Sequence, residues 1–455
     1  MALIGSDDTA AVLGELRRRK NEDDPDHFYQ YEVDAAGRLK RLFWADADAR
    51  ASSCGRSDDV VVIDTALGTN RYGAAFVPFL GMSHHRRPVL LGCAVLADQS
   101  PDSYVWLLRA LVMSMGQERP KSVITDGGDA LVHAVETVLP LSNHRICSCH
   151  LKEGVREHLG GWSAEDGFRS LMFEDGCSPV EFEERWRSLV ASHRTASNQE
   201  WLCRMYVKRE LWAAAFVRDK FFLGMASDED EGAECLCLSS GLRTSFSEDM
   251  TLLALLQLAD YRGNCMRAQE AELDEEADKS RVELTTEHEC LEVDAARSFT
   301  PANFAIVLEE IKALDDFFEI VDTLSSSSDG SGPKVYTLDL HGDLFSVLQS
   351  HDRANDDKET HSSAVFRCSC RKMLRDGLPC RHILHVLQHE KASSIPKCCK
   401  LGRLLRRGDT RRERLGEMEA LGRKVFDLAS QDAEEFEEIK EFLQDWLQDR
   451  ELSSS

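Results

Sequence analysis

The sequence predicts an α/β core with a helical insertion, followed by a small metal-binding module and a helical tail. Three observations indicate this fold class. Apolar stretches of strand length alternate with helical stretches between residues 59 and 150, and apolar and aromatic residues then recur at helical spacing through residues 151–225. Three cysteines and a histidine gather within residues 368–382. At 455 residues, the chain is long enough for two or three domains.

The expected elements of the core follow one another closely. Residues 9–20 predict a short amphipathic helix, and residues 28–44 predict a hairpin that turns at 34–37. The next elements are strands at 60–64, 75–81 and 89–96, a helix at 104–115, a strand at 122–126, a helix at 130–139 and a strand at 143–148. This order is that of the ribonuclease H-like fold, although many α/β domains could share it.

The rest of the chain is expected to be mostly helical. Residues 151–225 and 248–322 show helical spacing of apolar residues, with an acidic loop at 228–231 between them. A Ser/Gly-rich linker at 325–332 and strands within 334–350 lead to the cysteine cluster. A C-terminal helix is predicted by one apolar stripe: Phe436, Ile439, Leu443, Trp446 and Leu447.

These elements divide the chain into five expected regions. They are an N-terminal helix and hairpin (1–50), the α/β core with its helical insertion (51–250), a helical region and linker (251–332), the zinc-finger region (333–400), and a basic segment with an amphipathic helix (401–455). Residues 397–414 are basic, as in a nuclear-localisation or nucleic-acid patch or a solvated helix face.

Charge and cysteine content limit the possible classes of protein. The formal net charge of −25 excludes a chain-wide basic surface for nucleic acid, so any DNA contact needs a local basic patch. Residues 1–17 contain no apolar segment typical of a signal peptide, and we expect no membrane span because no run of about 18 apolar residues occurs. The 15 cysteines are therefore expected to be reduced and intracellular.

Cys368, Cys370, Cys380 and His382 are the candidate metal ligands. Three thiolates and one imidazole form the closed ligand set of a structural Zn²⁺ site. We expect the Cys-x-Cys pair on one extended segment, a turn at 376–379, and the Cys-x-His pair at the start of an apolar helix. The alternative is a small core of buried thiols. The spacing resembles a SWIM-type zinc finger, a resemblance that implies roles in DNA and protein interaction.

Asp64 and Asp126 each end a predicted strand of the core. In a ribonuclease H-like sheet these strand ends lie side by side. With a third acid from a later helix, they would hold two Mg²⁺ or Mn²⁺ ions for phosphodiester cleavage. Aspartate at a strand end is also ordinary turn chemistry, so the residues alone leave both interpretations open.

Several short motifs, in one order, resemble the core of Mutator-like (MULE-type) transposases. More closely, the chain resembles the plant far-red impaired response / far-red elongated hypocotyl family, which descends from such transposases. The matching segments are 43–46, 61–65, 70–72, 79–81, 84–85, 88–94, 124–126, 144–147, 222–225 and 368–384. The resemblance implies a nuclear transcription regulator of light-responsive genes that associates with DNA and forms homo- or heterodimers.

The resemblance also assigns Asp64, Asp126 and Glu234 to the acidic triad of the transposase. The segment at 233–237 lacks the Ser and Asn that flank the third acid in the family, and the acidic loop before it would repel DNA. We therefore expect a relic triad without enzymatic activity, to which Mg²⁺ or Mn²⁺ would bind only if it were functional. The alternatives are an active Mutator-like transposase with a two-metal site, or a remnant that only binds proteins.

Three further expectations concern residues beside these sites. Cys147 and His150 match a Cys-x-x-His element, for which a metal site with Cys149 is the alternative to buried or helix-start residues. His84 and His85 are expected to be exposed or structural. Full-length family members carry an N-terminal Cys/His zinc domain, and no such cluster precedes Asp64. We therefore expect a truncated, heterodimerising regulator that contacts DNA weakly or through a partner.

Overall fold

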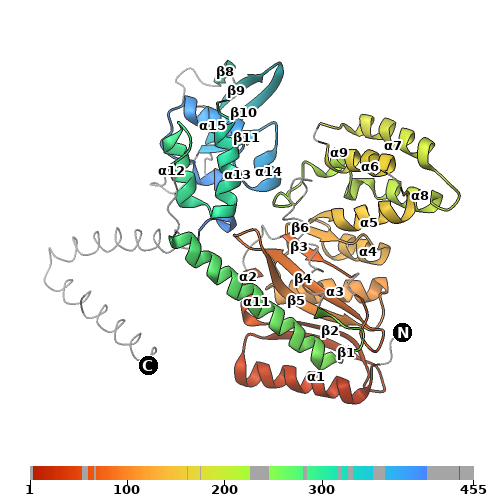
Figure 1. Cartoon of the computed structure of the whole chain (residues 1–455). Coiled ribbons are helices and arrows are strands. Elements are labelled where there is room, and N and C mark those ends of the chain that lie inside the picture. Colours follow the sequence, from red (N-terminus) through yellow and green to blue (C-terminus); the bar gives the residue numbers. More distant parts are fainter. Residues whose placement is uncertain are drawn as a thin grey trace.

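The computed structural model describes residues 4–53, 60–65, 68–160, 162–174, 176–225, 245–279, 284–315, 319–325, 332–351, 364–406 and 440. Figure 1 shows a sheet-based core, a helical lobe beside it, and a second lobe with a sheet of its own. Within the described part of the chain, no helix is long and apolar enough to cross a membrane. The acidic loop, Glu234 and the C-terminal apolar stripe lie outside the described residues.

A seven-stranded mixed sheet forms the core, in the order β1-β2-β5-β4-β3-β6-β7. Its strands are β1 (Phe28–Val33), β2 (Leu39–Ala45), β3 (Val60–Ile63), β4 (Ala75–Met82), β5 (Pro88–Leu96), β6 (Ser122–Thr125) and β7 (Asn143–Ile146). Across the sheet, the neighbours β1, β2, β5, β4 and β3 pair antiparallel, whereas β3, β6 and β7 pair parallel. The predicted α/β core, with three strands, a helix, a strand, a helix and a strand, is confirmed.

The two faces of the sheet bury different clusters. Val61 and Ile63 of β3 pack with α3 (Pro101–Ser114) and α4 (Asp129–Val138), while Val60 and Val62 belong to a cluster that continues into the second lobe. Successive side chains of a strand point to opposite faces of the sheet. The apolar run of β3 therefore supplies residues to both clusters. On the strands nearer β1, α1 (Ser6–Arg18) and α11 (Leu252–Lys279) pack against Trp44, Phe76 and Cys93.

The helical lobe follows β7 and has an aromatic core. Its elements are α5 (Ser148–His158), α6 (Trp162–Phe173), α7 (Pro179–His193), α8 (Gln199–Val207), a 3₁₀ turn (Arg209–Leu211) and α9 (Ala214–Val217). Phe168 stacks on Trp212 with ring centroids 4.5 Å apart. Ser178 caps α7 through a capping box with Glu181, which satisfies main-chain N–H groups of the first turn. The helical spacing of residues 151–225 therefore corresponds to a packed helical lobe.

The second lobe combines helices with a four-stranded antiparallel sheet, in the order β11-β10-β9-β8. Its elements are α12 (Glu289–Ser298), α13 (Pro301–Lys312), β8 (Glu319–Ser325), β9 (Lys334–Leu340), β10 (Asp343–His351), β11 (Ala364–Cys368), α14 (Lys372–Asp376), α15 (Arg381–His389) and 3₁₀ turns at Lys397–Cys399 and Gly402–Leu404. The expectation that the helical stretch extends to residue 322 is wrong, because residues 319–325 form the edge strand β8.

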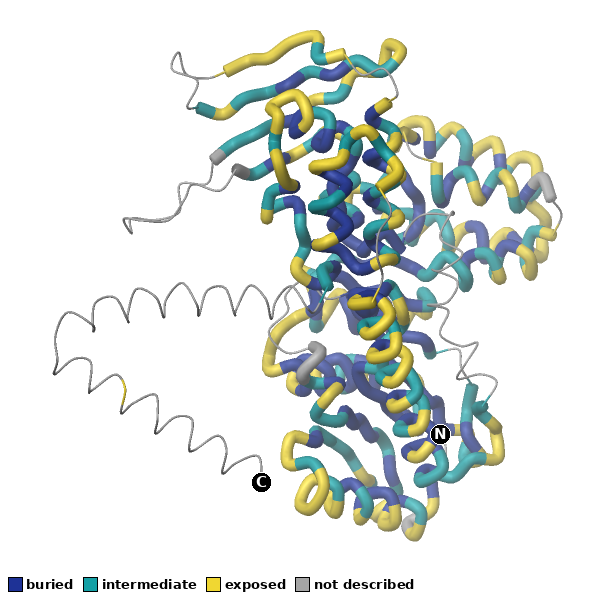
Figure 2. Tube along the Cα trace, turned by 60° about the vertical axis from the view of Figure 1, so that its left-hand side comes forward, coloured by how far each residue is buried: buried dark blue, intermediate teal, exposed yellow. Residues whose placement is uncertain are grey.

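The second lobe packs directly against the core. The N–H of Phe222 donates to the carbonyl of Arg375 at 3.2 Å, and Nε of Arg403 donates to the carbonyl of Met82 at 2.8 Å. Figure 2 shows buried residues continuing from the core into this lobe. The five region boundaries expected from the sequence stay predictions. The packing nevertheless shows that α11, expected in a separate helical region, covers the sheet of the core.

Candidate metal centre

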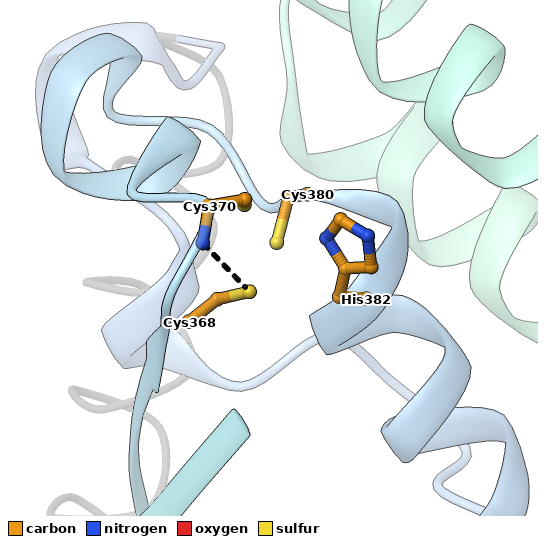
Figure 3. Close-up of side chains that lie close together, drawn as sticks. All are labelled: Cys368, Cys370, Cys380 and His382. Carbon is orange, nitrogen blue, oxygen red and sulfur yellow. Dashed lines mark hydrogen bonds between the residues drawn. The ribbon is translucent and has the colours of Figure 1, made fainter. Parts of the chain in front are cut away.

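The four predicted zinc ligands lie together in the second lobe. Each of Cys368, Cys370, Cys380 and His382 offers one ligand atom, and these atoms all lie within 4.8 Å of one another. Figure 3 shows the three cysteines and the imidazole facing a common point. Cys368 ends β11, and Cys380 and His382 stand at the start of α15.

Local backbone geometry brings the four residues together. Cys370 lies in the turn after β11, not on the extended segment expected for both thiolates, and Arg371 follows it at a φ of 58°. The N–H of Cys370 donates to the sulfur of Cys368 at 3.5 Å (Figure 3). Gly377, at a φ of 74°, ends the short helix α14, and a Cβ there would lie 2.8 Å from Leu401. Only glycine therefore fits this return of the chain toward Cys380.

Contacts from neighbouring elements hold the imidazole and the start of α15. The ring of His382 stacks on Phe345 of β10, with centroids 4.0 Å apart. The carboxylate of Glu310, a buried residue of α13, accepts a hydrogen bond from the N–H of Arg381 at 2.8 Å and another from its Nε at 3.1 Å. A negative group at the N-terminus of α15 also interacts favourably with the helix dipole and so stabilises this helix.

The donor set fits Zn²⁺. Cys380 and His382 are buried, whereas Cys368 and Cys370 are half-buried. Hydrogen bonds with Cys368 and, to a smaller extent, with Cys380 hold the pKa of the Cys370 thiol well below its usual range. Burial raises the pKa of the Cys380 thiol. Zinc binds thiolates, so a cluster that readily loses its first proton is suited to the ion. The Cys₃His cluster therefore supports zinc as the cofactor.

A cleft of about 690 Å³ adjoins the cluster, between the second lobe and the core. Its walls include Phe221 of the core and Cys368, and four cationic residues: Lys121, Arg367, Arg371 and Lys400. Lys400 pairs with Asp294 at 2.8 Å, and Arg371 pairs with Asp219. Arg367 of β11 is exposed, next to the candidate ligand Cys368. The cleft thus gathers cations, two of them paired with acids, and the exposed Arg367 gives it the kind of local positive charge that an acidic chain requires for any DNA contact.

The two strand-end aspartates lie at neighbouring positions of the core sheet. Ile63 of β3 pairs with Thr125 of β6 in parallel register, so Asp64 and Asp126 follow adjacent paired residues. Adjacent strands are about 4.7–4.9 Å apart. Asp64 is buried, with 3% of its surface exposed, whereas Asp126 is half-buried. Glu234, the third candidate acid, lies outside the described residues, so the triad stays a prediction.

Protein groups contact both aspartates. Oδ2 of Asp126 accepts hydrogen bonds from the N–H of Thr65, at 3.0 Å, and from its hydroxyl, and Oδ1 accepts from the N–H of Gly128 at 2.9 Å. Nε2 of His150, in the first turn of α5, lies 3.6 Å from Oδ1 of Asp64.

The Cys-x-x-His element therefore faces the strand-end aspartates. Burial alone would lower the pKa of His150, but contacts with Asp64 and Cys147 outweigh it and raise this pKa to about 10. These contacts favour the charged imidazole, which pairs with the Asp64 carboxylate. Cys149 is disulfide-bonded, so the expectation that all the cysteines are reduced is wrong for this residue. The alternative with Cys149 as a further metal ligand therefore does not fit.

His84 and His85 are buried, at 7% and 5% exposure, so the expectation of an exposed pair is wrong and the structural alternative remains. Both imidazoles contact Asp274 of α11. No sequence signal joins residues 190 positions apart in this way.

Comparison with known proteins matches two segments of the chain to protein families. The MULE transposase domain family matches residues 60–154, and the SWIM zinc finger family matches residues 367–391. Protein FAR1-RELATED SEQUENCE 7 of Arabidopsis thaliana is 28% identical over 85% of this chain and 48% of its own length. Protein FAR-RED IMPAIRED RESPONSE 1 of the same plant is 32% identical over 48% of this chain and 27% of its own length.

The relationship extends over most of this chain and over about half to two thirds of the length of several relatives. Protein FAR1-RELATED SEQUENCE 9 of Arabidopsis thaliana is 27% identical over 85% of this chain and 67% of its own length. The first relatives in this comparison are matched over about half of their length. The resemblance to the far-red impaired response family is confirmed.

Proposed function

We propose, from the premise that this chain is similar to the FAR1-related and far-red impaired response proteins, that it is a transposase-derived, zinc-binding regulator of transcription. We place it in the nucleus, associated with DNA, and in the regulation of light-responsive genes. Its core would serve as a scaffold and its finger as the contact with DNA or a partner. In this proposal the core has no enzymatic activity.

The core is proposed to be a ribonuclease H-like sheet. Support comes from the central strand order β5-β4-β3-β6-β7, in which β3 pairs antiparallel with β4 and parallel with β6. This arrangement puts the ends of β3 and β6 next to each other, where a ribonuclease H-like nuclease carries its first two acids. The proposal of a transposase ancestry therefore accounts for the positions of Asp64 and Asp126.

The Cys₃His cluster is the observation that carries the regulatory function. Four protein ligands leave a tetrahedral ion no open position for a substrate or water, so the zinc would be structural. The cluster is built into the lobe that packs on the core, and exposed Arg367 lies next to it, beside the basic cleft. A rigid finger beside local cations is suited to bind a polyanion or a partner.

Contacts of the two strand-end aspartates favour a relic over a working nuclease. Asp64 lies against the imidazole of His150, and Asp126 accepts hydrogen bonds from Thr65 and Gly128. Two-metal catalysis requires carboxylate oxygens directed at the ions. The altered sequence around Glu234 points the same way. We further propose that the chain forms homo- or heterodimers with family members.

A tethered reporter assay tests this function without knowledge of the DNA motif. The chain is fused to a heterologous DNA-binding domain and its effect on a reporter gene is measured. We expect changed transcription with the wild-type chain and with Asp64→Asn/Asp126→Asn, and loss of the effect in Cys380→Ser, since the finger would unfold. Exposed Cys290→Ser is the matched control.

The same variants distinguish the regulatory function from the alternative function, that of a Mutator-like transposase. Its specific support is the adjacency of Asp64 and Asp126. Calorimetry with Mn²⁺ on zinc-loaded protein, followed by a DNA cleavage assay, measures it directly. Mn²⁺ binding and cleavage that disappear in Asp64→Asn/Asp126→Asn would overturn the non-enzymatic proposal. A fusion without any effect on the reporter would overturn the regulatory one.

A further inference from the structure

A second cluster of metal-ligand residues lies in the turn between β4 and β5, far from the finger in sequence. The turn is closed by hydrogen bonds from the N–H of Ser83 to the carbonyl of Arg87 at 2.7 Å, and from the N–H of Arg86 to the carbonyl of Ser83 at 3.1 Å. The hydroxyl of Ser83 accepts from the N–H of His85 at 3.1 Å. The turn therefore directs His84 and His85 to one side, with ring centroids 4.3 Å apart.

Both imidazoles point at one carboxylate oxygen of α11. Nε2 of His84 lies 2.6 Å from Oδ1 of Asp274, and Nε2 of His85 lies 2.9 Å from the same atom. Glu270 precedes Asp274 by four residues and so shares its face of the helix. Oε2 of Glu270 lies 3.5 Å from Nδ1 of His84, and its Oε1 accepts a hydrogen bond from the Ser83 hydroxyl at 2.6 Å.

The cluster is enclosed but accessible from one side. His84, His85 and Glu270 are 7%, 5% and 6% exposed, whereas the side chain of Asp274 is 27% exposed. A carboxylate as deeply buried as Glu270 requires compensating charge or hydrogen bonds, of which Ser83 supplies one. A divalent ion between the imidazoles would supply that charge, and the exposed side of Asp274 gives it a path of entry.

We propose that His84, His85 and Asp274 form a second metal site for a divalent transition ion of the Zn²⁺ class, with Glu270, at Nδ1 of His84, orienting that imidazole from behind. Two imidazoles and a carboxylate are a ligand set for zinc and its neighbours in the first transition series. The ligand atoms of the two histidines and Asp274 lie within 4.8 Å of one another. An ion at about 2.0–2.2 Å from each ligand would need them about 3.3 Å apart, which small side-chain rotations provide.

The site lies at a structural junction, so its ion would act as a clamp. It would join the β4–β5 turn to α11 in the core. The carbonyl of His84 also accepts hydrogen bonds from Thr300, at 2.7 Å, and from Asn303, at 2.7 Å, both in the second lobe. The clamp would therefore stabilise the docking of that lobe on the core. This inference does not depend on the proposed regulatory function.

Cobalt titration of the chelator-treated full-length chain tests the second site. We expect two equivalents to bind to the wild type, and one to Asp274→Asn, with affinity at the second site falling at least about tenfold. Asn is nearly isosteric with Asp and still accepts hydrogen bonds from the histidines, which separates metal binding from packing. Exposed Glu275→Gln, in the same turn of α11, is the control and should keep both equivalents.

The absorption spectrum identifies which site is lost. Asp274→Asn should keep the strong sulfur-to-cobalt bands of the Cys₃His site, whereas Cys380→Ser should lose them and keep the weaker bands of nitrogen and oxygen ligands. His85→Gln decides the question if Asp274→Asn does not fold. One equivalent in the wild type, or two in Asp274→Asn, would overturn the proposal and leave a hydrogen-bonded cluster of histidines and acids.

Discussion

The side-chain amide of Asn303, on α13, donates a hydrogen bond to the main-chain carbonyl of His84, in the β4–β5 turn, at 2.7 Å. The same amide donates to the carbonyl of Leu404 at 3.0 Å, and Asn303 is fully buried. One side chain thus joins the core, α13 and the segment after the finger. The second lobe is held on the core by specific polar contacts as well as by apolar packing.

Replacing Asn303 by Leu should weaken this junction. Leu has a similar volume but no donor, so buried carbonyls lose a partner. We expect a loss of about 1–3 kcal/mol in the free energy of unfolding. Urea unfolding of the full chain measures it, and Asn264→Leu, at an exposed position of α11, should stay within about 0.5 kcal/mol of the wild type. Equal losses in both variants would show that the Asn303 contacts do not stabilise the docking.

Removing zinc should unfold the finger locally. A structural zinc site contributes its binding energy to folding, so a chelator or Cys380→Ser should release α14 and α15. Hydrogen exchange should then accelerate across residues 364–389, while β3 and β6 in the core keep their protection. Cys290→Ser, which changes an exposed free cysteine of α12, should leave exchange unaltered. Unchanged protection of α15 without metal would indicate a core of buried thiols instead of a zinc site.

His144 should make stability depend on pH. Burial, together with the charges of Lys220 and Lys208, lowers the pKa of this histidine from 6.5 to about 4. The unfolded chain therefore binds the proton first, and stability is lost as pH falls from about 6.5 toward 4. The loss attributable to His144 should reach about 2 kcal/mol at pH 5, since one pKa unit corresponds to about 1.4 kcal/mol.

Urea unfolding at pH 7 and pH 5 isolates this contribution. His144→Gln keeps a group that can hydrogen-bond the hydroxyl of Thr125, which contacts Nε2 of His144 at 2.9 Å. The variant should lose less stability than the wild type between the two pH values. Equal losses in the two proteins would mean that His144 is protonated in the folded state as readily as in the unfolded chain.

The core was predictable because its signals are local. Four consecutive apolar residues, Val60 to Ile63, fill both faces of the sheet, and such a run is typical of a buried strand. The finger was predictable as well, since the four ligands lie within fifteen residues of one another. Strand β8 was not, because most of its residues are exposed and show no apolar alternation. Its structure comes from pairing with β9 at the sheet edge.

The pairing of His84 and His85 with Asp274 could not be predicted either. The two histidines were expected to be exposed or structural, and the packing of α11 across the sheet buries them. Asp274 stands in a Glu-rich stretch that has the composition of a solvated helix face. Contacts between such distant segments follow from tertiary packing, for which short-range patterns carry no signal.

Arg367 should carry part of any DNA contact. It is exposed on β11 beside the zinc cluster and lines the cleft with Lys121, Arg371 and Lys400. Because the chain has a net charge of −25, a few local cations must supply the attraction to phosphate. Each phosphate contact releases counterions, so Arg367→Ala should weaken DNA binding and lower the slope of log K against log salt by about 1.

Fluorescence anisotropy with a duplex, over a range of salt concentrations, measures this slope. Arg187→Ala, at an exposed position of α7 in the helical lobe, removes the same charge away from the finger and is the matched control. A smaller slope in Arg367→Ala alone would locate the contact at the finger cleft. Equal slopes in the two variants would exclude Arg367 from the contact. A wild-type chain that does not bind DNA at low salt would require a partner for the association, because phosphate attraction is strongest there.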